Sequence, residues 1–96
     1  METSTITQID KYELTNIPFS KDDVLLDPLE QEERWRQLNH GMTLGNLHKL
    51  ATRISFKDQK DRSFETEATI WAVTENNVIL KNNIMIPIRS IFQVKT

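Results

Sequence analysis

The chain has 96 residues, of which 27% are charged, with a formal net charge of -2 and no cysteine. This length suits a single domain with a modest core, and the lack of cysteine excludes a disulfide framework and thiolate chemistry. No run approaches the ~20 apolar residues that a membrane span needs, and the opening segment METSTITQID lacks the basic and apolar regions of a signal peptide. We therefore expect a cytoplasmic protein with no membrane partner.

The charges are distributed unevenly along the chain. Residues 1–33 contain nine Asp or Glu and two Lys, a balance of -7, whereas residues 34–96 contain ten Lys or Arg and five Asp or Glu, a balance of +5. This asymmetry fits two halves of one chain that attract each other, and it also fits a nucleic-acid binder that is shielded by its own acidic segment.

Residues 1–26 are interpreted as an acidic, partly extended N-terminal arm. Residues 1–8 are polar and rich in Thr, so we expect them to be mobile. Residues 9–17 carry apolar side chains without helical spacing and are expected to be extended, lying along the following domain or reaching a second copy. Residues 20–24 begin with a capping serine and predict a helix of one or two turns.

A longer helix is predicted from Pro28 to about His40. Asp27 is a good N-cap, and proline is favoured at the first helical position. The apolar stripe of this helix is thin, so Trp35 is expected to be its main buried anchor. Gly41 fits the position that follows a helix end, and the second glycine of the chain comes four residues later. Both glycines therefore predict a sharp change of direction after the helix.

The rest of the chain predicts five strands joined by tight turns. Asn82 and Asn83 form a two-residue turn signal between two apolar runs, which indicates a hairpin. Alternation places Ile84 and Ile86 on one face, and Pro87 cannot donate to a ladder, so its strand is expected at a sheet edge. The expected strands cover residues 50–57, 66–74, 78–80, 84–88 and 91–94.

The segment RISFKDQKDRSFETEATIWAVTENNVILKNNIMIPIRSIFQV has the order of charged hairpin, long bent strand, short hairpin and final turn with strand. Over about residues 43–95 this order resembles the SH3-like and Sm-like small barrels, in which an N-terminal helix caps one end. Residues 43–47, 69–74 and 86–88 also look like small bacterial proteins without an assigned function, and the YolD-like proteins are a more distant comparison. No RNA-binding residue of the Sm type can be matched here.

The resemblance implies an α+β, mainly β fold, in which residues 27–96 form an N-terminal helix packed on a five-stranded antiparallel barrel. Closing five short strands into a barrel would remove exposed sheet edges. A likeness of fold favours binding over chemistry as the function, but it names no ligand.

Candidate chemistry is weak throughout the sequence. His40 and His48 are eight residues apart and no cysteine accompanies them, which is not a metal-ligand pattern. Glu65 and Glu67 share a strand face, as an acid and base pair would need, but a small barrel offers little enclosed space for a substrate. No glycine-rich phosphate loop is present. We therefore expect no catalytic residue, no cofactor and no metal, in a protein that is not an enzyme.

Two binding functions remain open. The first is a protein-interaction or self-association module, which would use the edge strand of Pro87 and the apolar part of the arm, and whose oligomer would be built from copies of this chain. The alternative is an RNA-binding or DNA-binding regulator that contacts phosphates through a basic rim. The residues of the basic rim are Arg53, Lys57, Lys60 and Arg62.

Two tryptophans are candidate interaction or stacking residues, Trp71 on the long strand and Trp35 on the helix. In a nucleic-acid binder, Trp71 would provide a platform on which a base stacks. Alternation places Trp71 beside Glu65 and Glu67, however, and acidic neighbours disfavour a polyanion. The other interpretation is that Trp71 packs beneath the arm or the helix.

Overall fold

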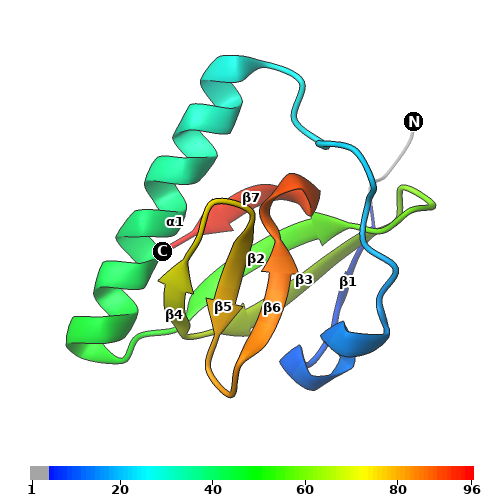
Figure 1. Cartoon of the computed structure of the whole chain (residues 1–96). Coiled ribbons are helices and arrows are strands. Elements are labelled where there is room, and N and C mark those ends of the chain that lie inside the picture. The colour runs from blue at the N-terminus through cyan, green and yellow to red at the C-terminus, as the bar shows by residue number, and fades with distance from the viewer. Residues whose placement is uncertain (1–4) are drawn as a thin grey trace.

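The structure is a computed structural model that describes residues 5–96, which form an α+β, mainly β fold (Figure 1). Seven strands make two sheets, one with the order β1–β3–β2–β7 and the other with the order β4–β5–β6. The strands are β1 Ile6–Gln8, β2 Thr52–Lys57, β3 Ser63–Ala68, β4 Ile70–Val73, β5 Asn77–Leu80, β6 Ile84–Pro87 and β7 Ile91–Lys95. The helices are α1 Pro28–His48 and the 3-10 helices η1 Lys11–Asn16 and η2 Ile88–Ser90.

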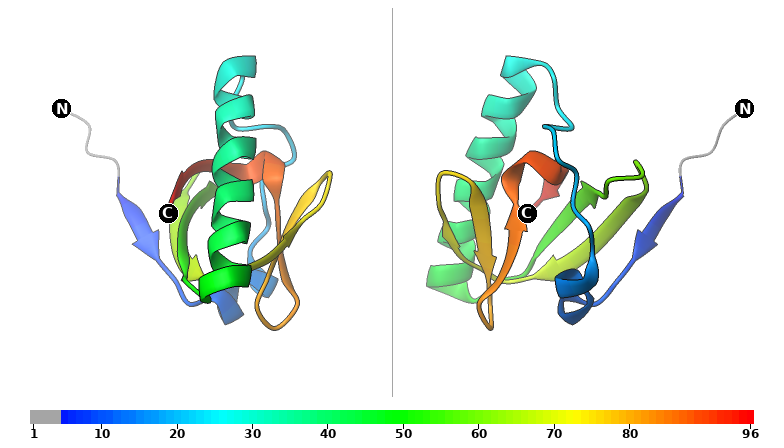
Figure 2. Two further views of the ribbon diagram at one scale, coloured as in Figure 1. Left: turned by 90° about the vertical axis from the view of Figure 1, so that its left-hand side faces the viewer. Right: turned by 45° about the vertical axis from the view of Figure 1, so that its right-hand side comes forward.

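No sheet closes into a barrel within residues 5–96, so the closed five-stranded barrel that we expected is not found. The helices explain this difference. α1 packs against β4 of the second sheet and β7 of the first, while η1 packs against β6 and β3 (Figure 2). Each helix thus bridges the two sheets, and the space between the sheets is covered by helices instead of by strand pairing.

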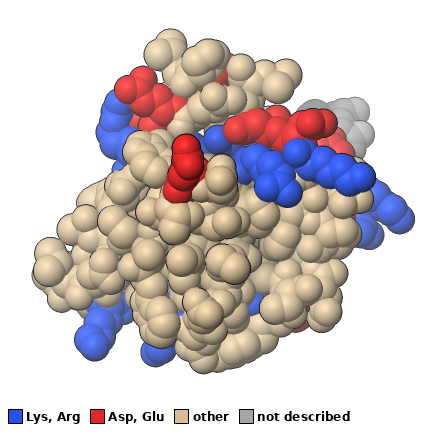
Figure 3. All heavy atoms as spheres, in the orientation of Figure 1, with Lys and Arg blue, Asp and Glu red and all other residues tan. Residues whose placement is uncertain are grey.

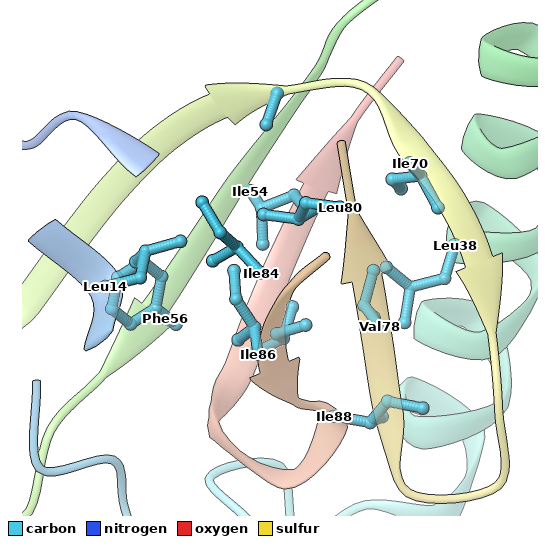
Figure 4. Close-up of a cluster of buried hydrophobic side chains, with 12 residues drawn as sticks. Leu14, Leu38, Ile54, Phe56, Ile70, Val78, Leu80, Ile84, Ile86 and Ile88 are labelled. Carbon is cyan, nitrogen blue, oxygen red and sulfur yellow. The ribbon is translucent and has the colours of Figure 1, made fainter. Parts of the chain in front are cut away.

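The core lies between the two sheets (Figure 4). β3 and β4 are separated only by Thr69, where the chain bends from one sheet into the other, so the single strand expected over residues 66–74 is in fact two. The side chains of the core come from both sheets, α1, η1 and η2. They are Leu14, Leu38, Ile54, Phe56, Ala68, Ile70, Val78, Leu80, Ile84, Ile86, Ile88 and Ile91.

The helix α1 continues to His48, well past its expected end near His40, and both glycines lie inside it. A Cβ atom on Gly41 would lie 2.8 Å from Thr52 Oγ1, and one on Gly45 would lie 2.6 Å from the carbonyl oxygen of Ile70. The glycines are therefore required because the helix approaches the strands closely, and not because the chain turns there. The turn comes one residue after the helix, where Lys49 adopts a left-handed conformation with φ 56.

The expectation that Trp35 anchors α1 is wrong. Trp35 is 44% exposed, whereas the residues of α1 that are buried are Arg34, Leu38, Gly41 and Gly45. These four residues recur at the helical spacing of three or four, so they define the face that packs on the sheets. The face was hard to recognise because an arginine and two glycines take positions that apolar residues usually occupy.

The described part of the arm packs on the rest of the chain. Residues 6–8, which we expected to be mobile, form β1 and pair in parallel with β3, while residues 1–4 lie outside the described part. Residues 11–16 form η1 and are not extended as expected. Asp10 caps η1, because its carboxylate accepts the N–H of Tyr12 while its own N–H donates to Glu13. Leu14 of η1 is part of the core.

The short helix expected over residues 20–24 is absent. Ser20 Oγ donates to the carbonyl oxygen of Asp22 and does not accept a helical N–H. The Asp23 carboxylate accepts the N–H of Leu25 and two hydrogen bonds from Arg34. A contact that is eleven residues away therefore overrides the local capping signal.

The hairpin prediction is confirmed. Asn82 and Asn83 have φ values of 72 and 63, in the left-handed region that asparagine tolerates, and together with Lys81 they form the three-residue loop that connects β5 to β6. Ile84 and Ile86 are buried as the alternation predicted, and the strand that contains Pro87 lies at an edge of its sheet. None of the helices in residues 5–96 combines the length and the apolar character that a membrane crossing requires.

Candidate interaction surface

The outer face of the β4–β5–β6 sheet differs from the strand surfaces of the first sheet. The three strands have the sequences IWAV, NVIL and IMIP, and none of these residues is charged. The face points toward the viewer in Figure 3, where a broad area without Lys, Arg, Asp or Glu covers these strands and charged atoms lie along its upper and lower margins. We call this area the uncharged face.

An apolar row crosses the uncharged face. Ile70, Val78, Leu80, Ile84 and Ile86 point into the core. The residues between them point outward, and the strand register pairs Ala72 with Ile79 and Ile79 with Met85. Trp71 lies at the irregularity in register between Ile70 and Ala72, a position typical of a β-bulge. We define the apolar row as Trp71, Ile79 and Met85.

The apolar row is largely accessible to solvent. Trp71 is 48% exposed and Met85 is 52% exposed, while Ile79 between them is partly buried. Trp71 also lines a cleft of about 260 Å³ between the C-terminal turn of α1 and β4. The interpretation that Trp71 packs beneath the helix or the arm therefore does not describe its position, because about half of its surface faces solvent.

Within the part of the chain that the structure describes, charged residues flank the uncharged face at the two ends of β5. Glu75 lies in the turn between β4 and β5, and Lys81 lies in the turn between β5 and β6. Lys49, the residue that follows α1, lines the same cleft as Lys81 and Trp71. None of the ion pairs within residues 5–96 involves Glu75, Lys81 or Lys49.

The basic rim belongs to the first sheet, and acidic residues accompany it. Arg53 Nε lies 4.0 Å from a Glu65 carboxylate oxygen, and Lys57 Nζ lies 3.3 Å from that of Asp61. Arg62 Nε lies 2.7 Å from Asp58 Oδ2. Lys60, in the turn between β2 and β3, takes part in no ion pair within the described residues. Three of the four cations of the rim thus have an acidic partner on the same chain.

Asp58 shows why Arg62 is held in place. The Asp58 side chain is fully buried and accepts the N–H groups of Lys60 and Arg62 together with Arg62 Nε. Burial by itself raises the pKa of Asp58, but these hydrogen bonds from Arg62 and Lys60 outweigh it and keep the pKa below its ordinary value. The charged turn is therefore a structural unit, in which a buried carboxylate organises the backbone.

The structure does not bring Trp71 and the basic rim together, because they belong to different sheets. Trp35 lies on α1, outside both sheets' strands, and is half-exposed. A binder that used the rim for phosphates and Trp71 for stacking would need a ligand that extends from one sheet to the other.

Glu65 and Glu67, which the sequence placed on one strand face, differ in burial and in hydrogen bonding. Glu65 is partly buried, accepts a 3.0 Å hydrogen bond from Gln8 Nε2 and lines a polar cleft of about 350 Å³, whereas Glu67 is exposed at the same cleft. His40 and His48 are exposed on α1. Within residues 5–96, no group of three or more His, Cys, Asp or Glu side chains is arranged to hold a metal ion.

The ion pair between Arg34 and Asp23 was not expected from the sequence. The Arg34 side chain is 6% exposed, donates to both Asp23 carboxylate oxygens at 2.8 and 2.7 Å, and donates to the carbonyl oxygen of Ile91 at 2.9 Å. Burial raises the pKa of Asp23, but the hydrogen bonds from Arg34 and Leu25 keep it below its ordinary value. This pair joins the arm, α1 and β7, so its role is structural.

Comparisons of the chain with protein-family models, with curated proteins and with solved structures give no match. A function for this protein can therefore be inferred only from its sequence and the geometry of its surface. Ile79, Met85, Glu75 and Lys49 were not expected as site residues, although one signal was visible: three successive strands without a charged residue.

Proposed function

We propose that this protein is a non-enzymatic binding module that associates with protein through its uncharged face, and in the first place with a second copy of itself. The observation that carries the proposal is an uncharged three-stranded surface with a half-exposed tryptophan and a half-exposed methionine. Contiguous exposed apolar surface marks sites of interaction. Aromatic residues and methionine are enriched where charged residues are depleted, in the centres of protein interfaces.

Charge argues for a second copy as the occupant. In a twofold dimer the same patch of both subunits meets itself, so a charge in the middle of the patch, near the axis, is brought close to its own copy. The outer surface of the first sheet carries many charges of both signs, whereas the strands of the second sheet carry none. Two such sheets can pack face to face at about 10 Å without burying a charge.

We also infer that the fold is an opened relative of the SH3-like and Sm-like small barrels. The support is the order of elements: a helix, a strand hairpin, a strand that bends at Thr69 into a second sheet, another hairpin and a 3-10 turn before the last strand. A fold of this kind favours a binding function and does not identify the ligand.

Sedimentation equilibrium of the full chain tests the proposal. We expect a concentration-dependent dimer that Trp71→Lys and Met85→Lys each convert to a monomer. Trp35→Lys is the matched control, because Trp35 is exposed to nearly the same extent, 44% against 48%, but lies on α1. Association that survives both changes on the uncharged face, or that is lost equally in the Trp35 variant, would contradict the proposal.

Nucleic-acid binding is the second candidate function. One observation favours it: Lys49 and Lys81, which have no ionic partner within residues 5–96, flank the exposed indole of Trp71. A single strand with one base on Trp71 and phosphates at the two lysines would use this arrangement. Titration with a random-sequence single-stranded pool tests it, since such binding would weaken steeply with salt.

A further inference from the structure

The charges at the ends of the uncharged face have opposite signs. β5 is the central strand of its sheet, with Glu75 just before it and Lys81 just after it. Lys49 adds a second positive charge at the Lys81 end, because both lysines line the cleft beside Trp71. The length of β5 spans about 10 Å, so the two ends are separate electrostatic sites.

Two twofold arrangements can place one uncharged face on another. If the twofold axis runs along the strands, the strands of the two copies are parallel, and Glu75 meets Glu75 while lysines meet lysines. If the axis runs across the strands, the strands are antiparallel, and the Glu75 end of each copy lies over the lysine end of the other. Like charges placed opposite each other are unfavourable, and complementary charges at the margin of an interface fix its register.

We propose that two copies of this chain pack face to face with antiparallel β4–β5–β6 sheets, so that Glu75 of each copy meets Lys81 and Lys49 of the other. This inference rests on the proposed function and goes further, because it names the orientation of the second copy and the residues that select it. The apolar row supplies the buried centre of the interface. Within residues 5–96, the three charged residues have no intramolecular ion pair to give up when they engage.

The symmetry doubles the effect of each charge, since both ends of the interface contain the same set of residues. Reversing Glu75 to Lys therefore removes the attractive contacts at both ends and places a new cation among the lysines of each end. We expect Glu75→Lys to weaken the dimer about tenfold, a size typical of two exposed charge pairs. The double variant Lys49→Glu with Lys81→Glu is expected to weaken it to a similar extent.

Mixing the two charge-reversed proteins tests whether Glu75 and the two lysines lie at the interface. A heterodimer of these variants is complementary in either orientation, so the orientation itself is decided by the single reversals and by cross-linking. In the antiparallel arrangement, each end of either homodimer carries charges of one sign, whereas each end of the heterodimer carries charges of both signs. The Glu75→Lys homodimer has cations at both ends and the double variant has anions at both ends. In the heterodimer, the Glu75→Lys position of one copy faces the Lys49→Glu and Lys81→Glu positions of the other. At the second end, the unchanged lysines of the first copy face the unchanged Glu75 of the other.

Both ends of the heterodimer are therefore complementary, and native mass spectrometry should show it in excess of both homodimers. Glu67→Lys and Lys60→Glu are matched controls, since both residues are exposed, have no ion pair within residues 5–96 and lie on the first sheet or its turn. A mixture of these two controls should give the statistical ratio of species.

Cross-linking gives an independent result, because the chain has no cysteine of its own. Glu75→Cys and Lys81→Cys proteins are treated with a short bismaleimide, each alone and in an equal mixture. The antiparallel arrangement predicts efficient linkage only in the mixture. Linkage of the Glu75→Cys protein with itself would overturn the proposed orientation.

The outcomes separate this inference from the proposed function. If Trp71→Lys and Met85→Lys abolish dimerisation but neither charge reversal weakens the dimer, or the Glu75→Cys protein links to itself, the orientation is wrong and the interaction surface stands. If the unmodified chain is a monomer at all concentrations, the proposed self-association fails as well.

Discussion

The two sheets of this protein differ in the charge of their outer surfaces and in how many of those charges are paired within the chain. On the first sheet, cations and carboxylates meet within the chain, as in the pair of Arg53 with Glu65 and the pair of Arg62 with Asp58. The strands of the second sheet have no charge to satisfy, and Trp71 and Met85 remain half-exposed. A cluster of cations in a sequence is thus a poor guide to a basic surface, whereas a lack of charge leaves apolar area that only another molecule can cover.

The largest effect is expected where the first sheet is joined to the arm and α1. Arg34→Ala leaves Asp23 partly buried without its partner, which should lower the free energy of unfolding by about 3–5 kcal/mol, as is typical of broken buried pairs. Urea unfolding measures this change. Arg36→Ala is the matched control, because Arg36 is exposed and its ion pairs on α1 should contribute under about 0.5 kcal/mol. Similar losses for both variants would contradict the structural role of Arg34.

A smaller effect is expected where α1 meets the second sheet. Gly45→Ala places a Cβ atom 2.6 Å from the backbone oxygen of Ile70, which must move. Alanine is otherwise the better helix former, so any destabilisation reports the close approach directly. We expect a loss of about 1–3 kcal/mol, the usual range for overpacking. A gain of stability would mean that the helix can withdraw from β4 at no cost.

Substitutions on the uncharged face should change self-association and leave the stability of the monomer nearly unchanged. Met85→Lys changes an exposed side chain, so its effect on the unfolding of the monomer should stay within about 0.5 kcal/mol. Its effect on the dimer should be at least about tenfold, because a buried lysine without a partner would be placed at the centre of the interface. Denaturation at a concentration where the protein is monomeric, together with sedimentation, separates the two quantities. A large loss of monomer stability would show that Met85 belongs to the core.

Lowering the pH should reduce the stability that Asp23 and Asp58 give to the folded chain. Asp23 and Asp58 have folded-state pKa values below their ordinary value, so the stability they contribute is present above about pH 4 and is lost as the pH falls through the folded pKa. The urea concentration at the unfolding midpoint should therefore decrease as the pH is lowered from about 5 to about 2. Asp58→Asn should be less stable at about pH 6 and should lose less on acidification. An equal loss in both proteins would assign the acid sensitivity to other carboxylates.

The smallest effect is expected on the basic rim. Replacing Lys57 and Lys60 by Gln removes one partly buried charge, which pairs with the exposed Asp61, and one exposed charge. Their contribution to stability should be below about 1 kcal/mol. Self-association should be unchanged, because these residues lie away from the uncharged face. Titration with single-stranded nucleic acid at two salt concentrations completes the comparison. A salt-dependent affinity that is lost with these two lysines would favour the nucleic-acid alternative and the original rim.

Removal of residues 1–26 is not a clean test of self-association. The described part of this arm contributes Leu14 to the core, pairs β1 with β3 and supplies Asp23 to Arg34. A truncated chain would therefore expose apolar core surface, and a change in its association would follow from partial unfolding. Single substitutions on the uncharged face avoid this difficulty.

Local signals in the sequence determined the elements that depend on near neighbours. The cap formed by Asp27 and Pro28, the turn at Asn82 and Asn83, and the edge position of Pro87 are set by the backbone preferences of the residues themselves. The absence of charge from the strands of the second sheet is likewise a property of the sequence alone.

Only the tertiary structure decided which surfaces are covered. Glycine is typical of a helix end, but Gly41 and Gly45 lie inside α1. They are needed there because the helix approaches Thr52 and Ile70 closely. Arg34 is buried and Trp35 is not, because Asp23 and the carbonyl of Ile91 come from distant parts of the chain. Likewise, α1 and η1 bridge the gaps between the sheets and leave one sheet face open. Burial and ion pairing depend on partners that are far away in sequence, and a local pattern carries no information about them.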